Sequence, residues 1–334
     1  MLLFLIDLYY NIIGMICLDL KKYKTQDISF YLALEEYLTN INNNDYFFLW
    51  DIDRSIIVGK NKIINTEVNL DFVNKYGFKV YRRPSGGGAI YGDNGDFMYS
   101  FISRNKTKDE MYDIFINKFV KALKDLNLDV KLSGRNDLTF LDKKFSGSAI
   151  YFKNNHTILH GTFLYDSDLT LLEKFLTPDN DKLLSKGIIS VKSRVINLKE
   201  YINLDKDSLM DYLLHNISND ITIRELNSNE FIEVLEIKKK FDDNNYINKT
   251  SIPYTFHNKI KTKSGIIEIY IDIKNNIIKN IDLVGDFFIN KDINDLYSLF
   301  IGININDINK IIEKIKIKDY IIDLENNEFI ELFK

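Results

Sequence analysis

Three consecutive glycines between two strand-like runs constrain this chain more than any other feature of its sequence. Gly86, Gly87 and Gly88 follow the residues RRPS at 82–85 and precede AIY at 89–91. Glycine lets the backbone approach a ligand closely, and successive N–H groups can converge on one anion. The two arginines can clamp a phosphate or a carboxylate. The segment predicts an anion-binding loop, with a flexible turn carrying surface arginines as the alternative, and its spacing fits neither a P-loop nor a dinucleotide fingerprint.

Short β-rich runs alternate with helical patterns on both sides of this loop. Strands are predicted at residues 46–50, 55–58, 79–82, 97–103, 139–141 and 148–152, and the last two flank a predicted turn at 142–147. Helices are predicted at 27–39, capped by Asp27, and after Thr107, which forms a capping box with Glu110. The alternation predicts one α/β or α+β domain over residues 15–225.

The last third of the chain has a different pattern. Isoleucines at 267, 269, 271 and 273 alternate with polar residues, which predicts a half-buried strand. A turn at Asn275 and Asn276 leads to a second strand at 277–284, and two helical patterns follow at 293–300 and 307–315. Residues 251–334 are therefore predicted to form a small α+β domain, and the polar stretch 226–250 is predicted to be the linker.

Composition excludes several classes of protein. The chain of 334 residues has 44 Lys and Arg against 48 Asp and Glu, so no net positive charge favours nucleic acid. A single cysteine, Cys17, excludes an intramolecular disulfide and cysteine-based metal sites, and it indicates a reducing compartment. We expect a cytoplasmic protein that binds neither nucleic acid nor membrane.

The first residues are apolar but fit neither a signal peptide nor a membrane span. Met1 to Ile16 lacks an early Lys or Arg, and the run is shorter than the roughly 20 residues that a span requires. Residues 1–14 are interpreted as an extension upstream of a start at Met15. The alternative is a first core strand at 12–18.

Three further segments carry polar groups suited to phosphate chemistry. Asn136 and Asp137 follow Gly134 and could serve a magnesium-bound phosphate. Lys144, ahead of a small-residue run, could place one ammonium at an acyl phosphate. The basic stretch 177–198 could fold over a nucleotide. Taken alone, each segment has a simpler structural explanation. These are an Asx turn for the first, a surface lysine pair for the second, and a solvated helix and turn for the third.

The order and spacing of these segments resemble the lipoate–protein ligase family, within the biotin/lipoyl protein ligase superfamily. The resemblance covers LALEEY at 32–37, the glycine loop at 82–91, GRNDL at 134–138, KFSGSA at 144–149, HGTFL at 160–164, the segment 186–198 and GDFF at 285–288. It implies an α+β fold in which a large catalytic domain with mixed sheets and flanking helices carries a small α+β C-terminal accessory domain.

The resemblance also implies a two-step reaction. ATP and lipoate would give lipoyl-AMP and pyrophosphate, with Mg²⁺ as cofactor. The lipoyl group would then pass to a lysine of an acceptor, either a lipoyl domain of a 2-oxoacid dehydrogenase E2 subunit or the glycine-cleavage H protein. Neither step needs a covalent residue of the enzyme, because the acceptor lysine is itself the nucleophile.

Site residues are carried over motif by motif. Lys144 would be the catalytic residue and Asp137 the Mg²⁺ ligand. The adenylate would be bound by Arg83, Gly87, Gly88, Ala89, Ile90, Tyr91, Asn136, Asp137, Lys144, Lys186 and Gly187. Lipoate would be bound by Arg83, Ser85, Gly86, Lys144, His160 and Gly161 in an apolar tunnel. A buried structural role is the alternative for His160.

Two departures from the family pattern leave other functions open. Gly92 replaces a histidine and Asp96 replaces an asparagine, and a carboxylate near phosphate would repel it unless a cation pairs with it. One alternative is a lipoyl or octanoyl transferase that uses a preformed acyl-AMP. A cysteine-thioester route is disfavoured because Cys17 lies far from every motif. A non-catalytic lipoyl- or nucleotide-binding homologue is the other alternative, against which Lys144 argues.

Overall fold

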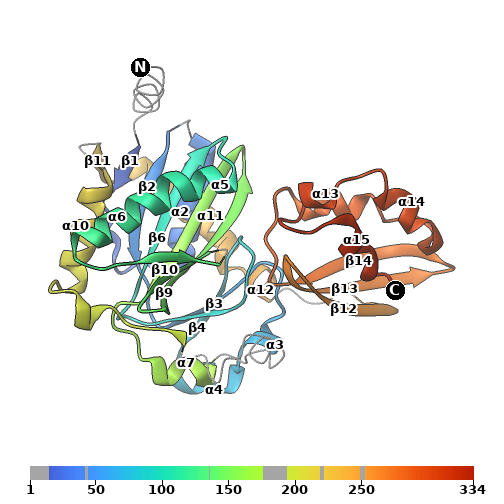
Figure 1. The fold of residues 1–334 in the computed structure, drawn as a ribbon, viewed down its shortest axis with the longest axis horizontal. Coiled ribbons are helices and arrows are strands. Elements are labelled where there is room, and N and C mark those ends of the chain that lie inside the picture. The colour runs from blue at the N-terminus through green and yellow to red at the C-terminus, as the bar shows by residue number, and fades with distance from the viewer. Residues whose placement is uncertain (1–14, 42–43, 135, 176–193, 219–221, 249–252) are drawn as a thin grey trace.

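A computed structural model describes residues 15–41, 44–134, 136–175, 194–218, 222–248 and 253–334. A large N-terminal unit is built around an extended sheet, and a smaller C-terminal unit lies beside it (Figure 1). None of the helices in these ranges is long and apolar enough to cross a membrane.

The main sheet has eight strands and mixed pairing. Its order is β11 (Ile223–Arg224), β1 (Ile16–Leu18), β2 (Tyr46–Asp51), β6 (Phe97–Arg104), β10 (His156–Phe163), β9 (Lys143–Lys153), β8 (Asp137–Phe140) and β7 (Lys131–Ser133). β1 is parallel to β2 and to β11, and the other neighbours are antiparallel. The predicted mixed sheet is confirmed.

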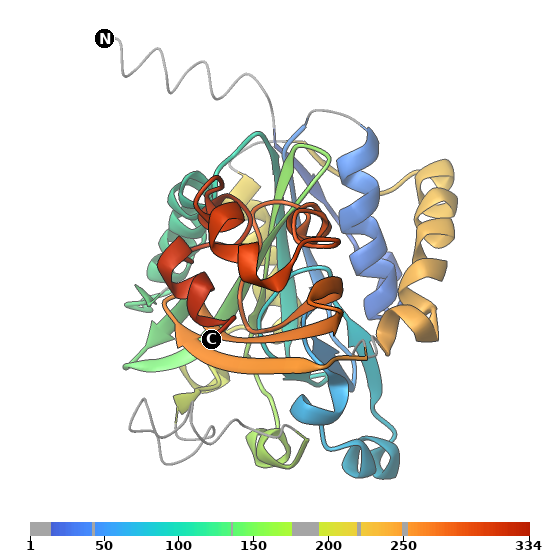
Figure 2. The ribbon, with the colours of Figure 1, turned by 90° about the vertical axis from the view of Figure 1, so that its right-hand side faces the viewer.

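Helices cover both faces of this sheet, and side chains alternate between the two layers. Phe47 and Leu49 of β2 pack under α5 (Lys108–Met111), a π-helical turn (Tyr112–Ile116), α6 (Asn117–Asp125) and α10 (Lys206–Ser218). Phe48 and Trp50 face α2 (Ile28–Ile41) and α11 (Ser228–Asp242), which lie side by side in Figure 2. The capping box between Thr107 and Glu110 is confirmed at the start of α5.

A second, three-stranded sheet carries the glycine loop. Its order is β4 (Lys79–Arg82), β3 (Ser55–Val58) and β5 (Ile90–Gly92), and the loop joins β4 to β5. An apolar cluster that includes Phe78, Tyr91 and Phe175 packs this sheet against α3 (Ile64–Glu67), α4 (Leu70–Tyr76) and α7 (Leu169–Phe175). Residues 83–89 are thus held between two strands of a packed sheet.

The C-terminal unit is an antiparallel sheet with helices on one face. β12 (Phe256–Thr262), β13 (Gly265–Lys274) and β14 (Ile277–Gly285) pack against α13 (Ile293–Ser298), α14 (Ile308–Ile312) and α15 (Asn326–Glu331). The predicted alternation holds, because Ile267, Ile269 and Ile271 are buried and the residues between them are partly exposed. Asn275 and Asn276 form the turn with positive φ angles.

Two predicted segments fold differently. The turn expected at 142–147 is only two residues long, Leu141 and Asp142, both with positive φ, and β9 begins at Lys143. The small residues that suggested a turn lie in the strand and pair with β8, and Gly147 leaves room for the Lys144 side chain. The polar stretch 226–250 contains α11 and α12 (Asn244–Ile247), and α11 contributes Val234 and Phe241 to the core beside α2.

Candidate active site

Arg83 is the centre of the glycine loop. Its guanidinium is buried and donates to the carbonyl oxygens of Ile57 at 2.9 Å, Gly86 at 2.8 Å and Gly88 at 2.7 Å. Its Nε also donates to the Ser85 hydroxyl at 3.0 Å. Burial lowers the pKa of Arg83 to about 10, so the group stays charged at neutral pH. In this structure the Arg83 charge lies inside the loop, and its hydrogen bonds orient the carbonyl groups of Gly86 and Gly88.

Two of the glycines are required by close contacts. A Cβ on Gly86 would lie 2.0 Å from the carbonyl oxygen of Phe287 in the C-terminal unit. Gly87 has a φ of +90°, and a Cβ there would meet the Arg83 guanidinium at 2.9 Å. The backbone of the C-terminal unit therefore rests directly on the predicted anion-binding loop. A hydrogen bond from Gly285 N to Asn61 O at 2.9 Å adds to this contact.

Glu67 is a loop partner that the sequence did not reveal. Its Oε2 accepts from Ala89 N at 3.3 Å and lies beside Gly88, and its Oε1 pairs with Lys62 at 2.8 Å. A carboxylate oxygen thus occupies a position where a loop N–H group could meet an anionic ligand. Nothing in the sequence pattern indicates this contact, because α3 and the loop are separate in the chain.

Lys144, Asp137 and Arg194 form one ion cluster. Lys144 Nζ lies 2.7 Å from Asp137 Oδ1, and Arg194 NH2 lies 2.7 Å from Asp137 Oδ2. β8 and β9 bring the first two together, and Ile196 N donates to Lys144 O at 2.9 Å, which brings in Arg194. The cluster places two cations around one carboxylate, a charge pattern suited to an anionic substrate.

Other predicted site residues have their own partners. The Asn136 amide donates to the Ser148 carbonyl, and Ser148 N donates back to Asn136 O at 2.9 Å. A Cβ on Gly161 would overlap the Tyr99 ring at 2.3 Å, so this glycine makes room for an aromatic side chain. Lys186 and Gly187 lie outside the described residues.

The Tyr91 ring packs in the core beside the loop. It stacks on Phe78 and Phe175, with centroids 5.5 and 5.6 Å away, and its hydroxyl donates to Asp93 at 2.9 Å. Its neighbour Ile90 is partly buried and packs against the core on the α2 side of the main sheet. Both residues support the loop from β5.

The two departures from the family pattern are explained by packing. A Cβ on Gly92 would meet Ile52 Cδ1 at 2.1 Å, so the space that a larger side chain would need is filled. Asp96 is buried and accepts from Tyr165 N at 3.1 Å and from the Ser167 hydroxyl. Burial raises the pKa of Asp96 to about 8. Its carboxyl group therefore holds residues 165–167 against the start of β6 through these two hydrogen bonds.

His160 connects the loop to a buried acid. Its Nε2 lies 2.6 Å from Ser85 Oγ, and its Nδ1 lies 3.0 Å from both carboxylate oxygens of Glu35. His160 and Ala149 are paired across β10 and β9, as are Gly161 and Ser148, so the two groups of site residues lie on adjacent strands. Glu35 was seen in the sequence only as part of LALEEY.

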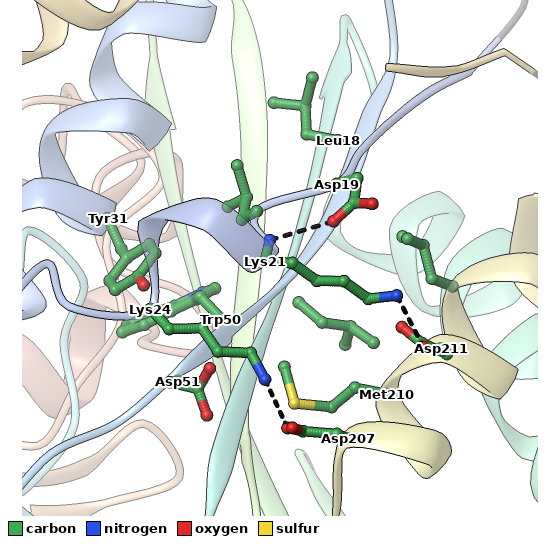
Figure 3. A pocket seen from close by; sticks show the side chains of 13 residues that line it. Leu18, Asp19, Lys21, Lys24, Tyr31, Trp50, Asp51, Asp207, Met210 and Asp211 are labelled. Carbon is green, nitrogen blue, oxygen red and sulfur yellow. Dashed lines mark hydrogen bonds and ion pairs between the residues drawn. The ribbon is translucent and has the colours of Figure 1, made fainter. Parts of the chain in front are cut away.

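A cavity lies between β1, β2 and α10. Trp50 and Met210 line it, and ion pairs of Lys21 with Asp211 and Lys24 with Asp207 lie at its edge (Figure 3). Trp50 Nε1 donates to Ser100 Oγ at 2.9 Å. The indole therefore stands between this cavity and the polar cluster around Glu35.

Comparisons with known proteins decide the family. A model of the lipoyl protein ligase A/B catalytic domain matches residues 27–218, more than half of the chain. The chain belongs to the lipoate–protein ligase family. A model of the bacterial lipoate protein ligase C-terminus matches residues 251–333, so both parts of a two-part ligase are present.

Lipoate–protein ligases from two bacteria match this chain over nearly its whole length. Lipoate–protein ligase 1 of Staphylococcus aureus is 32% identical over 90% of this chain and 95% of its own. Lipoate-protein ligase LplJ of Bacillus subtilis is 28% identical over the same shares. The crystal structure of Plasmodium falciparum LipL1 in complex with lipoate has a TM-score of 0.76 and 25% identity, and covers 96% of this chain and 98% of that one. The α+β ligase fold is confirmed.

Proposed function

We propose that this protein is an ATP-dependent lipoate–protein ligase. The observation that carries the proposal is the cluster of Lys144, Asp137 and Arg194. Lys144 lies on β9, which pairs with β10, and His160 of β10 contacts Ser85 of the glycine loop. A family member described as a lipoate-protein ligase A bound with ATP shares the fold, with a TM-score of 0.58. The names of the relatives support lipoate as substrate, and the ATP-bound structure supports ATP as co-substrate.

In the first step, a lipoate carboxylate oxygen attacks the α-phosphorus of ATP. The new C–O–P linkage forms as the bond to pyrophosphate breaks, so negative charge must be neutralised at both ends. Lys144 and Arg194 supply two cations next to each other, and the buried charge of Arg83 lies behind the loop. Positioning and charge stabilisation are sufficient, without a protein nucleophile.

In the second step, the amine of an acceptor lysine attacks the acyl carbonyl carbon. The amide bond forms, the carbon–oxygen bond to AMP breaks with its electron pair on the AMP phosphate, and the amine proton passes to that phosphate or to water. We propose that Lys144 stabilises the charge on the carbonyl oxygen and on the departing phosphate in this step. Cys17 is buried in β1, and burial raises the pKa of its thiol to about 12, which argues against a thioester route.

Asp137 is the proposed ligand of Mg²⁺. In the part of the chain that the structure describes, no three His, Cys, Asp or Glu side chains gather to hold a metal ion. One carboxylate can serve Mg²⁺, because this ion commonly takes one or two carboxylates together with substrate phosphates. Both oxygens of Asp137 pair with Lys144 and Arg194 in this structure, so the ion would have to displace at least one of these pairs. The ion would neutralise phosphate charge there.

The acceptor is proposed to be a lipoyl domain, in an E2 subunit of a 2-oxoacid dehydrogenase or in the glycine-cleavage H protein. An archaeal lipoate protein ligase with a related fold has been described together with its E2 lipoyl domain. A cytoplasmic location is also proposed, and the single, buried thiol of Cys17 supports a reducing compartment.

Lipoate-dependent exchange between ATP and pyrophosphate tests the activation step. Wild type should exchange, and Lys144→Ala should lose most of the exchange. Lys143→Ala is the matched control, since Lys143 is the exposed neighbour on the same strand and should retain exchange. If wild type lacks exchange but transfers lipoyl from synthetic lipoyl-AMP, the protein is a transferase. Binding without either activity would indicate a non-catalytic homologue.

A further inference from the structure

Four buried side chains form a continuous hydrogen-bonded chain from the glycine loop to helix α2. Arg83 Nε lies 3.0 Å from Ser85 Oγ, Ser85 Oγ lies 2.6 Å from His160 Nε2, and His160 Nδ1 lies 3.0 Å from the Glu35 carboxylate. All four are almost completely buried, with at most 5% of any of them exposed. A buried chain of this kind is favourable only if every polar group in it is satisfied.

We assign an ionised carboxylate to Glu35 and a neutral imidazole to His160, and this assignment gives each hydrogen bond of the chain a direction. An arginine can only donate and an ionised carboxylate can only accept. Arg83 Nε therefore donates to Ser85, and His160 Nδ1–H donates to Glu35. The remaining hydroxyl proton of Ser85 is then donated to His160 Nε2. The chain thus connects a buried cation to a buried anion through two neutral groups, and the carboxylate determines the tautomer of His160.

The Glu35 carboxylate also accepts hydrogen bonds from two other buried side chains. It accepts from Ser100 Oγ at 2.6 Å and from the Tyr151 hydroxyl at 3.1 Å. Ser100 in turn accepts from Trp50, whose indole borders the cavity of Figure 3. Glu35 therefore sits where hydrogen bonds from the cavity wall and from the glycine loop meet.

We propose that Glu35 is a positioning residue for the adenylation site. Through His160 and Ser85 it holds the Arg83 guanidinium in the orientation that binds the carbonyl groups of Gly86 and Gly88. The loop then keeps the conformation that receives the acyl-adenylate. This inference rests on the proposed function, because it assigns Glu35 a role in that reaction without contact to the reacting atoms.

Glu35→Gln tests the role with little change in size. The substitution removes the negative charge and one of the two oxygens that lie 3.0 Å from His160 Nδ1, which weakens the preference for a proton on Nδ1 and favours the tautomer with Nε2–H directed at Ser85. Ser85 Oγ would then accept from both His160 and Arg83, and its own hydroxyl proton would lose the acceptor that His160 Nε2 provides in the wild type. We expect the KM for ATP and for lipoate in the exchange reaction to rise about tenfold, the size of effect that follows from one lost buried hydrogen bond. The exchange rate at saturation should change less.

Glu36→Gln is the matched control. Glu36 is the next residue of α2, but it is only partly buried and pairs with Lys153 and Lys240, each at 2.7 Å. Its replacement should leave both KM values unchanged. Equal KM values in wild type, Glu35→Gln and Glu36→Gln would overturn the proposal, as would equal increases in both variants.

The imidazole nitrogen NMR signals of His160 give a readout that a purely structural role would not move. They can be assigned by their loss in His160→Gln. Wild type should show Nδ1–H, and Glu35→Gln should show Nε2–H. If Glu35→Gln fails to fold, Ser85→Ala cuts the chain next to Arg83: a raised KM for ATP with the wild-type tautomer supports the proposal, and an unchanged KM for ATP refutes it. The KM for ATP is used because Ser85 is itself a predicted lipoate-binding residue. Absence of exchange in wild type would refute the proposed function, while the tautomer would still test the hydrogen-bonded chain.

Discussion

The strongest prediction concerns Asp96: the protonation of this buried carboxyl group should make the free energy of unfolding depend on pH. Only 2% of Asp96 is exposed, and burial, together with the nearby Asp93, raises its pKa from 3.8 to about 8. The folded protein therefore keeps a proton that the unfolded chain releases above about pH 4. Stability should fall as the pH rises from about 4 to about 8, since the folded state binds more protons over that range.

Asp96→Asn removes this dependence and keeps the shape. The asparagine oxygen can accept from Tyr165 N, and its amide can donate to the Ser167 hydroxyl. Each pKa unit corresponds to about 1.4 kcal/mol, so the variant's advantage should grow by about 1.4 kcal/mol per pH unit. We expect it to be under about 1 kcal/mol at pH 4 and to reach at most about 5 kcal/mol at pH 8.

Urea denaturation between pH 5 and pH 8 measures this advantage. Asp129→Asn is the control, because Asp129 is exposed and should give a constant difference from wild type. If the free energies of unfolding of wild type and Asp96→Asn run parallel across this range, the carboxyl group does not titrate as its burial requires. The reasoning would then be refuted.

The other predictions concern the site. Gly86→Ala would place a methyl group against Phe287 O, so we expect a fall in the thermal midpoint and at least about tenfold weaker exchange; wild-type values for both would contradict the close contact. Gly147→Ala would put its Cβ 2.4 Å from Lys144 Nζ, so exchange should fall while the thermal midpoint changes little. Arg194→Ala should raise the KM for ATP, measured by exchange, because one cation leaves the cluster. Cys17→Ala should transfer lipoyl at the wild-type rate, and loss of transfer would favour a thioester route.

Local pattern was enough to place most strands. The bounds predicted for β3 and β4 match the structure, and so does the isoleucine alternation of β13, because each depends on neighbours along the chain. The turn at 142–147 was wrong for a tertiary reason. Residues 143–147 pair with β8, and the carbonyl oxygens of Lys144 and Phe145 accept from Ile196 N and Leu164 N, so contacts outside this segment make it a strand.

The sequence by itself determined which residues could carry the chemistry and in what order they occur. Glycines, arginines and a lysine at family spacing were enough to indicate the ligase. Only the tertiary structure decided which groups meet. Glu35 and His160 are hydrogen-bonded although they are 125 residues apart in the chain. Phe287 of the C-terminal unit contacts Gly86 of the glycine loop. Local periodicity has no information about such contacts, because they depend on how whole strands and units pack.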